Sequence, residues 1–415
     1  MSSHDTLAAH IDEARLWARH MALAQFGATP AGGVDRQALS QAEIAARRAC
    51  VHWGRALELT PFSDAIGNLF LRCEGSEPQA LPVLTGSHLD SQPTGGKFDG
   101  SYGVLAGLEA IQAMREAGFR PRCPIEVVAW CNEEGSRFAP GMMGSAVFRG
   151  QRRLDDMLGV ADAGGVTVAQ CLARVRAAEP DIALRAPGFP VAAFVEAHIE
   201  QGPILELEGC TIGVVSGIQG KRVFHVSVSG EESHAGTTPL TLRKDALVAA
   251  VDILAALQRQ MHDDADVVKF TVGRLELSPN APSVVPARAR FSIDLRHPDA
   301  ATLGALGDRI AGICAAHRGP CAVQVHELSN DPPLIFAGAM RDTIRRSAAA
   351  LGIAHMDMPS AAGHDARHLH YVCPTGMIFV PCAGGLSHNE AEAATSRDLY
   401  DGARVLVQTL AALAG

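Results

Sequence analysis

The sequence predicts an α/β protein in which a domain with a mostly parallel sheet is interrupted by an inserted α+β domain. Three observations support this prediction. The 415 residues exceed what one ordinary core needs, so two domains are expected. Short apolar runs alternate with helical patterns in the first third of the chain, whereas runs of period two are concentrated between about residues 222 and 328.

The apolar spacing of residues 7–57 predicts helices that are interrupted at GATPAGGVD, where glycine and proline cluster. Leu81–Thr85 and Ile125–Cys131 are short strand-like runs, and Val104–Glu116 between them has helical spacing. Strand, helix and strand in alternation indicate a parallel sheet. We therefore expect parallel strands at the centre of the first domain.

Four strand-like runs end in clusters of histidine and acidic residues. Leu81–Thr85 is followed by GSHLD and Ile125–Cys131 by NEEGSRF, while Ala192–Val195 leads into EAHIEQG and Met377–Pro381 into CAGGLSHNE. Open α/β sheets bind their ligands at the carboxyl ends of the strands, so these endings predict a site. The candidate side chains are His88, Asp99, Glu133, Glu134, His198 and His388.

The inserted domain is predicted from a change of pattern. Its order is β-α-β-β-α-β, which is typical of a ferredoxin-like unit. We predict this domain at residues 218–329, which leaves residues 1–217 and 330–415 as one discontinuous domain. The expected strands are Arg222–Ser229, Val267–Leu277, Val284–Arg296 and Ala322–Leu328, and the expected helices are 241–261 and Asp299–His317.

Composition excludes several function classes. A formal net charge of -9 without a basic tail argues against a nucleic-acid partner. The N-terminal segment MSSHDTLAAHIDEARLWARH has no uninterrupted apolar run, so we expect neither a secretory signal nor a membrane anchor, and we expect a cytoplasmic protein. Ten scattered cysteines without a C-x-x-C pair predict thiols in a reducing compartment.

The chemistry of the strand-end residues predicts a metal site. Imidazole and carboxylate together suit Zn, Mn, Co or Ni, and two metals about 3.5–4 Å apart need a bridging carboxylate. One Asp between a pair of histidines and a Glu-His pair would give each metal three protein ligands and leave positions open for water. Of the adjacent Glu133 and Glu134, one can ligate while the other accepts a proton, as in metal-assisted hydrolysis. Each residue alone is more commonly a capping or surface residue, but their occurrence together at four strand ends favours the metal site.

Six segments match the pattern of a known enzyme family in order. They are GSHLDSQPTGGKFDGSYGVLAGLEA, CNEEGSRFAPGMMGSAVFRG, EAHIEQGPILE, GEESHAGTTPLTLRKDAL, PSAAGHDA and FVPCAGGLSHNE. Over about residues 60–390 the chain resembles the dinuclear-metal amidohydrolases of the M20 peptidase clan, in particular the hydantoinase/carbamoylase branch. The resemblance implies two divalent metal ions per subunit and a homodimer formed through the inserted domain, which would serve for dimerisation and as a lid.

The resemblance also implies a role for each candidate residue. Glu133 would be the general base, and Asp90 would hydrogen-bond a ligand histidine and fix its ring. The implied ligands are His88 and His198 on one metal, Glu134 and His388 on the other, and Asp99 between them.

Further residues are implied to contact the substrate. His234 would polarise the substrate carbonyl in the partner subunit's site, although a turn histidine that caps the next helix is the alternative. Arg296 would hold an α-carboxylate, unless it forms only a surface ion pair. Gln201 and Gly363 would lie beside the substrate. In PNAPSVVP the chain departs from the pattern, because Ser283 stands where an Asn is usual and Asn280 lies three residues earlier.

The function implied by the resemblance is hydrolysis of the carbamoyl C-N bond of N-carbamoyl-L-amino acids to the amino acid, ammonia and carbon dioxide. Allantoate amidohydrolase and β-ureidopropionase are the alternatives within the branch. A rival of another class is a catalytically silent dimeric protein that binds a small ureido or carbamoyl compound. No nucleic-acid or membrane partner is expected.

Overall fold

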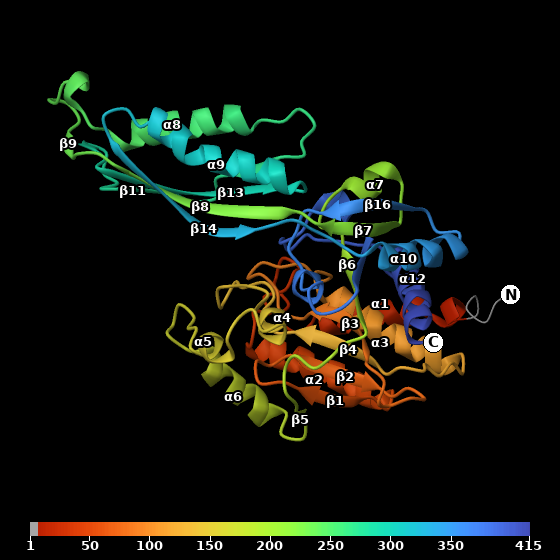
Figure 1. Ribbon diagram of the computed structural model, residues 1–415. Helices are drawn as coiled ribbons and strands as arrows, with labels where there is room; N and C mark the ends of the chain where they lie inside the picture. The colour runs from red at the N-terminus through yellow and green to blue at the C-terminus, as the bar shows by residue number, and fades with distance from the viewer. Residues whose placement is uncertain (1–6) are drawn as a thin grey trace. The chain divides into compact units, whose positions relative to one another are not determined.

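The computed structural model describes residues 7–415, so residues 1–6 of the N-terminal segment considered above lie outside the described residues. The chain forms two compact units (Figure 1). The first contains the chain up to Ser216 and from Phe336 onward, and the second contains Gly217–Ile335. Among the described residues, no helix is both long and apolar enough to cross a membrane.

A ten-stranded sheet forms the framework of the first unit, with the strand order β15-β7-β17-β6-β3-β4-β2-β1-β5 and with β16 beside β7. Its strands are β1 (Thr60–Ser63), β2 (Leu69–Cys73), β3 (Val83–His88), β4 (Ile125–Trp130), β5 (Ala183–Leu184), β6 (Ala193–Ile199), β7 (Ile212–Ile218), β15 (Leu334–Ile335), β16 (His355–Ser360) and β17 (Thr375–Val380).

The four central strands β17, β6, β3 and β4 are parallel to one another and buried along their whole length. Full burial on both faces explains why these strands are continuous apolar runs instead of alternating ones. The predicted α/β class with a parallel sheet is confirmed. The parallel order brings the carboxyl ends of these four strands to one edge of the sheet.

Antiparallel strands flank the parallel centre, and the sequence analysis predicted none of them. β1 and β2 form a hairpin whose turn is closed by Asp64, which accepts hydrogen bonds from the amides of Ile66 and Asn68. These strands are only four and five residues long, too short for a clear period.

Helices cover the sheet, and some of them begin at side-chain caps. Asp12, Ser40 and Thr395 accept hydrogen bonds from the first turns of α1, α2 and α12. The segment 143–178, for which the sequence predicted no elements, forms α4, α5 and α6. The helices are η1 (Leu7–His10), α1 (Glu13–Leu23), α2 (Gln41–Ala56), α3 (Ser101–Glu116), α4 (Met143–Phe148), α5 (Leu154–Leu158), α6 (Val168–Ala178), α7 (Ile204–Glu208), α10 (Gly338–Ala350), α11 (Ala366–Leu369), η3 (Ala383–Gly385) and α12 (Ser396–Ala414).

The second unit is a five-stranded antiparallel sheet, ordered β10-β13-β8-β14 with β11 beside β13, and its core is shared with two helices. A separate pair, β9 and β12, extends from one end of this unit (Figure 1). The elements are β8 (Gly220–Ser229), β9 (Ser233–His234), η2 (Leu240–Leu242), α8 (Ala246–Met261), β10 (Lys269–Thr271), β11 (Leu275–Ser278), β12 (Val284–Val285), β13 (Arg288–His297), α9 (Ala300–Ala316) and β14 (Ala322–Asp331).

Several element boundaries in this unit differ from the expectation. The run Val267–Leu277 is two strands interrupted at Gly273, and Val284–Arg296 is divided at Pro286, which has no amide to donate. β14 continues through Asp331, so part of the expected connector is strand. Helix α8 begins later than residue 241 because Asp245 caps it through the amides of Leu247 and Val248.

A buried histidine in α1 predicts how stability depends on pH. The His20 ring is fully buried between Phe98 and Tyr102, and neither ring nitrogen has a hydrogen-bond partner. Burial, with a smaller effect of the Arg36 charge, lowers the pKa of His20 to about 3. Below about pH 6.5 the His20 ring is therefore protonated in the unfolded chain and stays neutral in the folded chain. The free energy of unfolding consequently falls as pH decreases.

We expect His20→Phe to remove this effect while keeping the aromatic packing. Between pH 7 and pH 5 the variant should lose roughly 2 kcal/mol less unfolding free energy than the wild type. Urea unfolding at several pH values measures this difference. His52 is exposed on α2, and His52→Gln should follow the wild type. Equal pH dependence of His20→Phe and wild type would contradict the assignment.

Candidate metal centre

The predicted site residues of the first unit meet at the carboxyl edge of the parallel strands. His88 is the last residue of β3, and His198 lies near the end of β6. Glu133 and Glu134 follow β4, and His388 follows β17 after η3. Asp99 precedes α3, and Gly100 is the one residue between Asp99 and the first residue of this helix.

Gly100 makes the approach of Asp99 to His88 possible. Its φ of 62° lies in the left-handed region, and a Cβ atom at this position would be 2.3 Å from the His88 ring. Any other side chain here would both strain the backbone and displace the imidazole.

Asp99 lies between two groups of side chains, and each of its oxygens faces a different group. Asp99 Oδ1 is 3.6 Å from His88 Nε2 and 3.2 Å from His198 Nε2. Asp99 Oδ2 is 3.4 Å from His388 Nε2, which is also 3.4 Å from Glu134 Oε2. Two sets of three potential donor atoms, each within a span of 4.8 Å, thus share Asp99. This is the donor arrangement that a bridging carboxylate requires.

The backbone orients the two buried imidazoles. The Nδ1 atoms of His88 and His198 lie 2.9 and 2.8 Å from the carbonyl oxygens of Asp90 and Ile199. A carbonyl can only accept, so Nδ1 of each ring donates and Nε2 faces the cluster. The orientation suits metal ligation through Nε2.

The carboxylate of Asp90 contacts the next loop. Its two oxygens accept hydrogen bonds from the amides of Glu133 and Glu134, both at 3.1 Å. The His88 ring is held by the carbonyl of Asp90, since the Asp90 carboxylate lies 3.7 Å from Nδ1. Asp90 therefore links the His88 strand to the loop that carries the paired glutamates.

The electrostatics of the cluster favour a cation. Burial raises the pKa of Glu134 to about 8, and the charge of Asp99 adds to this effect. Burial likewise raises the pKa of Glu133 well above its ordinary value, against the attraction of His88. Acids held together in this way repel one another, and a divalent ion among them would remove the repulsion. The donor set therefore fits divalent metal ions.

Two of the predicted substrate contacts lie in the same unit. Gln201 Nε2 donates to Asp99 Oδ2 at 3.0 Å and to Ser387 Oγ at 3.2 Å. Gly363 precedes His364, which is buried and packs against the His198 ring with a centroid distance of 4.5 Å.

The remaining predicted residues lie at opposite ends of the second unit. His234 in β9 is paired with Val284, and the carbonyl of Ser283 accepts a hydrogen bond from Ala235. The Nδ1 atom of His234 accepts hydrogen bonds from the amides of Gly236 and Thr237. Asn280 lies beyond Ser278, which is paired with Arg288 at the start of β13.

Arg296 is at the other end of β13, where it is paired with Lys221. The eight steps along the strand from Arg288 to Arg296 span about 26 Å at roughly 3.3 Å per residue. The guanidinium of Arg296 contacts Asp294 through Nε at 2.8 Å and Nη2 at 3.1 Å.

Comparison with known proteins identifies the family. The model of peptidase family M20/M25/M40 matches residues 84–412. The chain belongs to this family. An N-carbamoyl-L-amino-acid amidohydrolase of Rhizobium meliloti is 40% identical over 94% of both chains, and an allantoate amidohydrolase of Bacillus subtilis is 35% identical over 94% of this chain and 95% of that protein. The crystal structure of an amidase of the hydantoinase/carbamoylase family from Burkholderia multivorans has a TM-score of 0.88 at 43% identity, covering 97% of this chain and 98% of that one.

The M20 site contains further buried acids, of which the sequence analysis missed Glu196. Glu196, two residues before His198, accepts hydrogen bonds from Ser87 Oγ and the amide of Ala366. Asp365 is fully buried and accepts a hydrogen bond from Ser145. Residues two apart on a strand share a face, so the spacing of Glu196 from His198 could have indicated its place.

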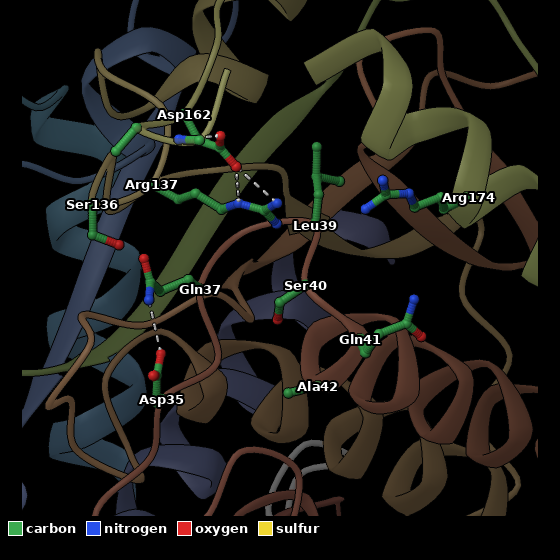
Figure 2. A pocket seen from close by; sticks show the side chains of 12 residues that line it. Asp35, Gln37, Leu39, Ser40, Gln41, Ala42, Ser136, Arg137, Asp162 and Arg174 are labelled. Carbon is green, nitrogen blue, oxygen red and sulfur yellow. Dashed lines mark hydrogen bonds and ion pairs between the residues drawn. The ribbon is translucent and has the colours of Figure 1, made fainter. Parts of the chain in front are cut away.

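A surface cavity is lined in part by Ser136 and Arg137, which belong to the loop that begins with Glu133 (Figure 2). None of the predicted site residues lines this cavity. It is bordered by Arg137, whose Nε and Nη2 atoms donate to Asp162 at 3.1 and 3.0 Å. Arg137 also donates to the carbonyl of Ala38 at 3.0 Å. These bonds fix the end of the loop that begins with Glu133.

We expect Asp99→Asn to lose most of its divalent metal, because the change removes the one negative charge that both donor groups share. Elemental analysis and titration of the metal-free protein with Mn²⁺ measure the loss. Asp64→Asn, another buried acid whose oxygen accepts two backbone amides, is the control and should bind Mn²⁺ like the wild type. Full metal content in Asp99→Asn would contradict the shared role.

Proposed function

We propose that this protein is a metal-dependent amidohydrolase that cleaves the carbamoyl C-N bond of N-carbamoyl-L-amino acids. The observation that carries the proposal is the position of Asp99, whose two oxygens face separate donor groups. Membership of the M20 family and the N-carbamoyl-L-amino-acid amidohydrolases among its relatives support the assignment of the bond that is cleaved.

Two divalent ions would be held in the cluster, one by His88 and His198 and the other by Glu134 and His388. Asp99 would contribute to both. Zn, Mn, Co and Ni all accept these ligands. Such ions, when bound, lower the pKa of water and polarise carbonyl oxygens.

Glu133 serves as the general base in this proposal. Its Oε2 lies 3.7 Å from His88 Nε2, next to the donor groups and outside both sets of three. It takes a proton from the attacking water and delivers that proton to the nitrogen that leaves. Water adds to the carbamoyl carbon, the bond to the amino-acid nitrogen breaks, and the carbamic acid released decomposes to ammonia and carbon dioxide.

Arg296 and His234 would contact the same substrate from different subunits. The fork of Arg296 matches an α-carboxylate, and His234 would donate a hydrogen bond to the carbonyl oxygen as negative charge develops there. A span of about 26 Å of strand separates the two ends of β13. One small substrate therefore cannot contact both residues of a single chain, which supports a homodimer.

The two units have different tasks in the proposal. The first unit is the catalytic domain, and the second is the dimerisation and lid domain that carries Arg296 at one end and His234, Ser283 and Asn280 at the other. These residues at the two ends of the second unit would contact the substrate, and Gln201 and Gly363 would contact it from the first unit.

The proposed activity is tested on a panel of substrates. We expect metal-reconstituted protein to release ammonia from N-carbamoyl-L-amino acids at a higher kcat/KM than from β-ureidopropionate or allantoate. Preference for allantoate would instead assign the activity for which the Bacillus subtilis relative is named. Binding without ammonia from any compound would identify a silent binding protein and overturn the proposal.

Mixing two inactive variants tests the exchange of His234 between subunits. Glu133→Gln should lower kcat by about 10²–10⁴-fold through loss of the base, and His234→Ala should also be nearly inactive. In a mixed dimer, one site would then contain both intact groups. After random exchange of subunits in a two-fold dimer, about a quarter of wild-type activity should return.

Subunit exchange is verified by native mass spectrometry of differently tagged chains. Mixed dimers that remain inactive would show that His234 does not act across the interface. The double variant Glu133→Gln/His234→Ala mixed with wild type is the control. In its mixed dimers the intact Glu133 and the intact His234 belong to the same chain and would lie in different sites, so these dimers should be inactive.

A further inference from the structure

Glu392 contacts two of the three loops that carry the donor group of Asp99, Glu134 and His388. It lies four residues after His388 and is 2% exposed. Its Oε1 accepts hydrogen bonds from the amides of Phe98 and Asp99 at 3.0 and 3.1 Å. Its Oε2 accepts a hydrogen bond from Ser387 Oγ at 2.9 Å.

Several hydrogen bonds hold the loop of His388, and those of Glu392 join it to the backbone of the Asp99 loop. The His388 side chain is 51% exposed, and its φ of 53° is unusual for a residue other than glycine. Between β17 and α12 this loop forms only the three-residue η3. Ser387, the neighbour of His388, is tied through Glu392 to the amide of Asp99, which is distant in sequence.

The packing around the Glu392 carboxyl group leaves it little freedom. A Cβ atom on Gly96 would lie 1.9 Å from the carboxyl carbon, so the Asp99 loop closes directly over this group. The Glu392 amide donates to the carbonyl of Asn389 at 3.0 Å, which fixes the turn after His388. Both ends of Glu392 are therefore constrained.

Glu392 and Asp90 have matching roles. Asp90 accepts the consecutive amides of Glu133 and Glu134, and Glu392 accepts the consecutive amides of Phe98 and Asp99. Burying a carboxylate beside Asp99 is unfavourable unless its hydrogen bonds compensate. The compensation comes entirely from the two metal-binding loops.

We propose that Glu392 is a positioning residue that fixes Asp99 relative to His388 and so forms the donor group of Asp99, Glu134 and His388. The inference rests on the proposed two-metal function. Glu392 would touch neither substrate nor metal, and it would act through the backbone of Asp99 and the hydroxyl of Ser387. Loss of Glu392 would selectively lower the affinity for the metal ion that this donor group holds.

The test is titration of the metal-free full-length protein with Co²⁺, followed by calorimetry and by the visible absorption of the bound ion. We expect Glu392→Ala to lower the affinity for one of the two Co²⁺ ions by about 10–100-fold, the range found when a partner of a metal ligand is removed. The other ion should be little affected. Glu392→Gln should recover most of the affinity, because its amide oxygen can still accept both backbone amides.

Asp64→Ala is the matched control for a purely structural loss. Asp64 Oδ1 accepts the amides of Ile66 and Asn68, and its Oδ2 accepts Asn68 Nδ2 at 2.8 Å, which is the same number of bonds as Glu392 accepts. This variant should lose thermal stability and keep both Co²⁺ affinities. Equal Co²⁺ binding by Glu392→Ala and wild type would overturn the inference.

A second variant covers the case in which Glu392→Ala does not fold. Ser387→Ala removes the hydroxyl that joins Glu392 to the His388 loop, together with the contacts of that hydroxyl to Gln201 Nε2 and Asp99 Oδ2. It should weaken the binding of the same Co²⁺ ion by several fold, less than the loss expected for Glu392→Ala. Unchanged binding would again overturn the inference. Wild-type protein that binds fewer than two Co²⁺ ions would instead contradict the two-metal proposal itself.

Discussion

The burial of several carboxylates at one edge of the parallel sheet is the constraint on which the first unit depends. Asp90, Asp99 and Glu392 are each at most 5% exposed, and a buried anion is costly unless it is hydrogen-bonded or paired. The surrounding loops satisfy this requirement for Asp90 and Glu392 with consecutive pairs of backbone amides. The Asp99 carboxylate instead faces histidine side chains and accepts a hydrogen bond from Gln201. The shape of these loops and the clustering of the acids are therefore one property, because neither is stable without the other.

The parallel order of β17, β6, β3 and β4 explains why the sequence reveals so much of this site. In parallel strands the carboxyl ends meet at one edge, so polar residues after apolar runs that are far apart in the chain become neighbours. His88, Glu134 and His198 were identifiable for this reason. A strand of four or five residues contains too few positions for its period to be recognised, which is why β1 and β2 were missed.

Side-chain partners were less predictable than strand ends. Nothing in the motif around Asp90 indicates that its carbonyl, and not its carboxylate, holds the His88 ring. The contact of Arg296 with Asp294 likewise depends on rotamers that the strand pattern does not specify. Glu392 follows His388 closely in sequence, yet its burial depends on a loop nearly three hundred residues away. Such long-range packing leaves no local periodicity.

Gly100 has a consequence for how this sequence can diverge. Replacement of Gly273, Gly304 or Gly312 would place a side chain in open space, whereas at Gly100 every replacement directs a Cβ atom into the His88 imidazole. A lineage that retains His88 and Asp99 thus has no neutral path away from glycine at this position. Position 100 should stay fixed while the surrounding loop drifts, and a natural variant with another residue there would mark a chain that has abandoned the metal.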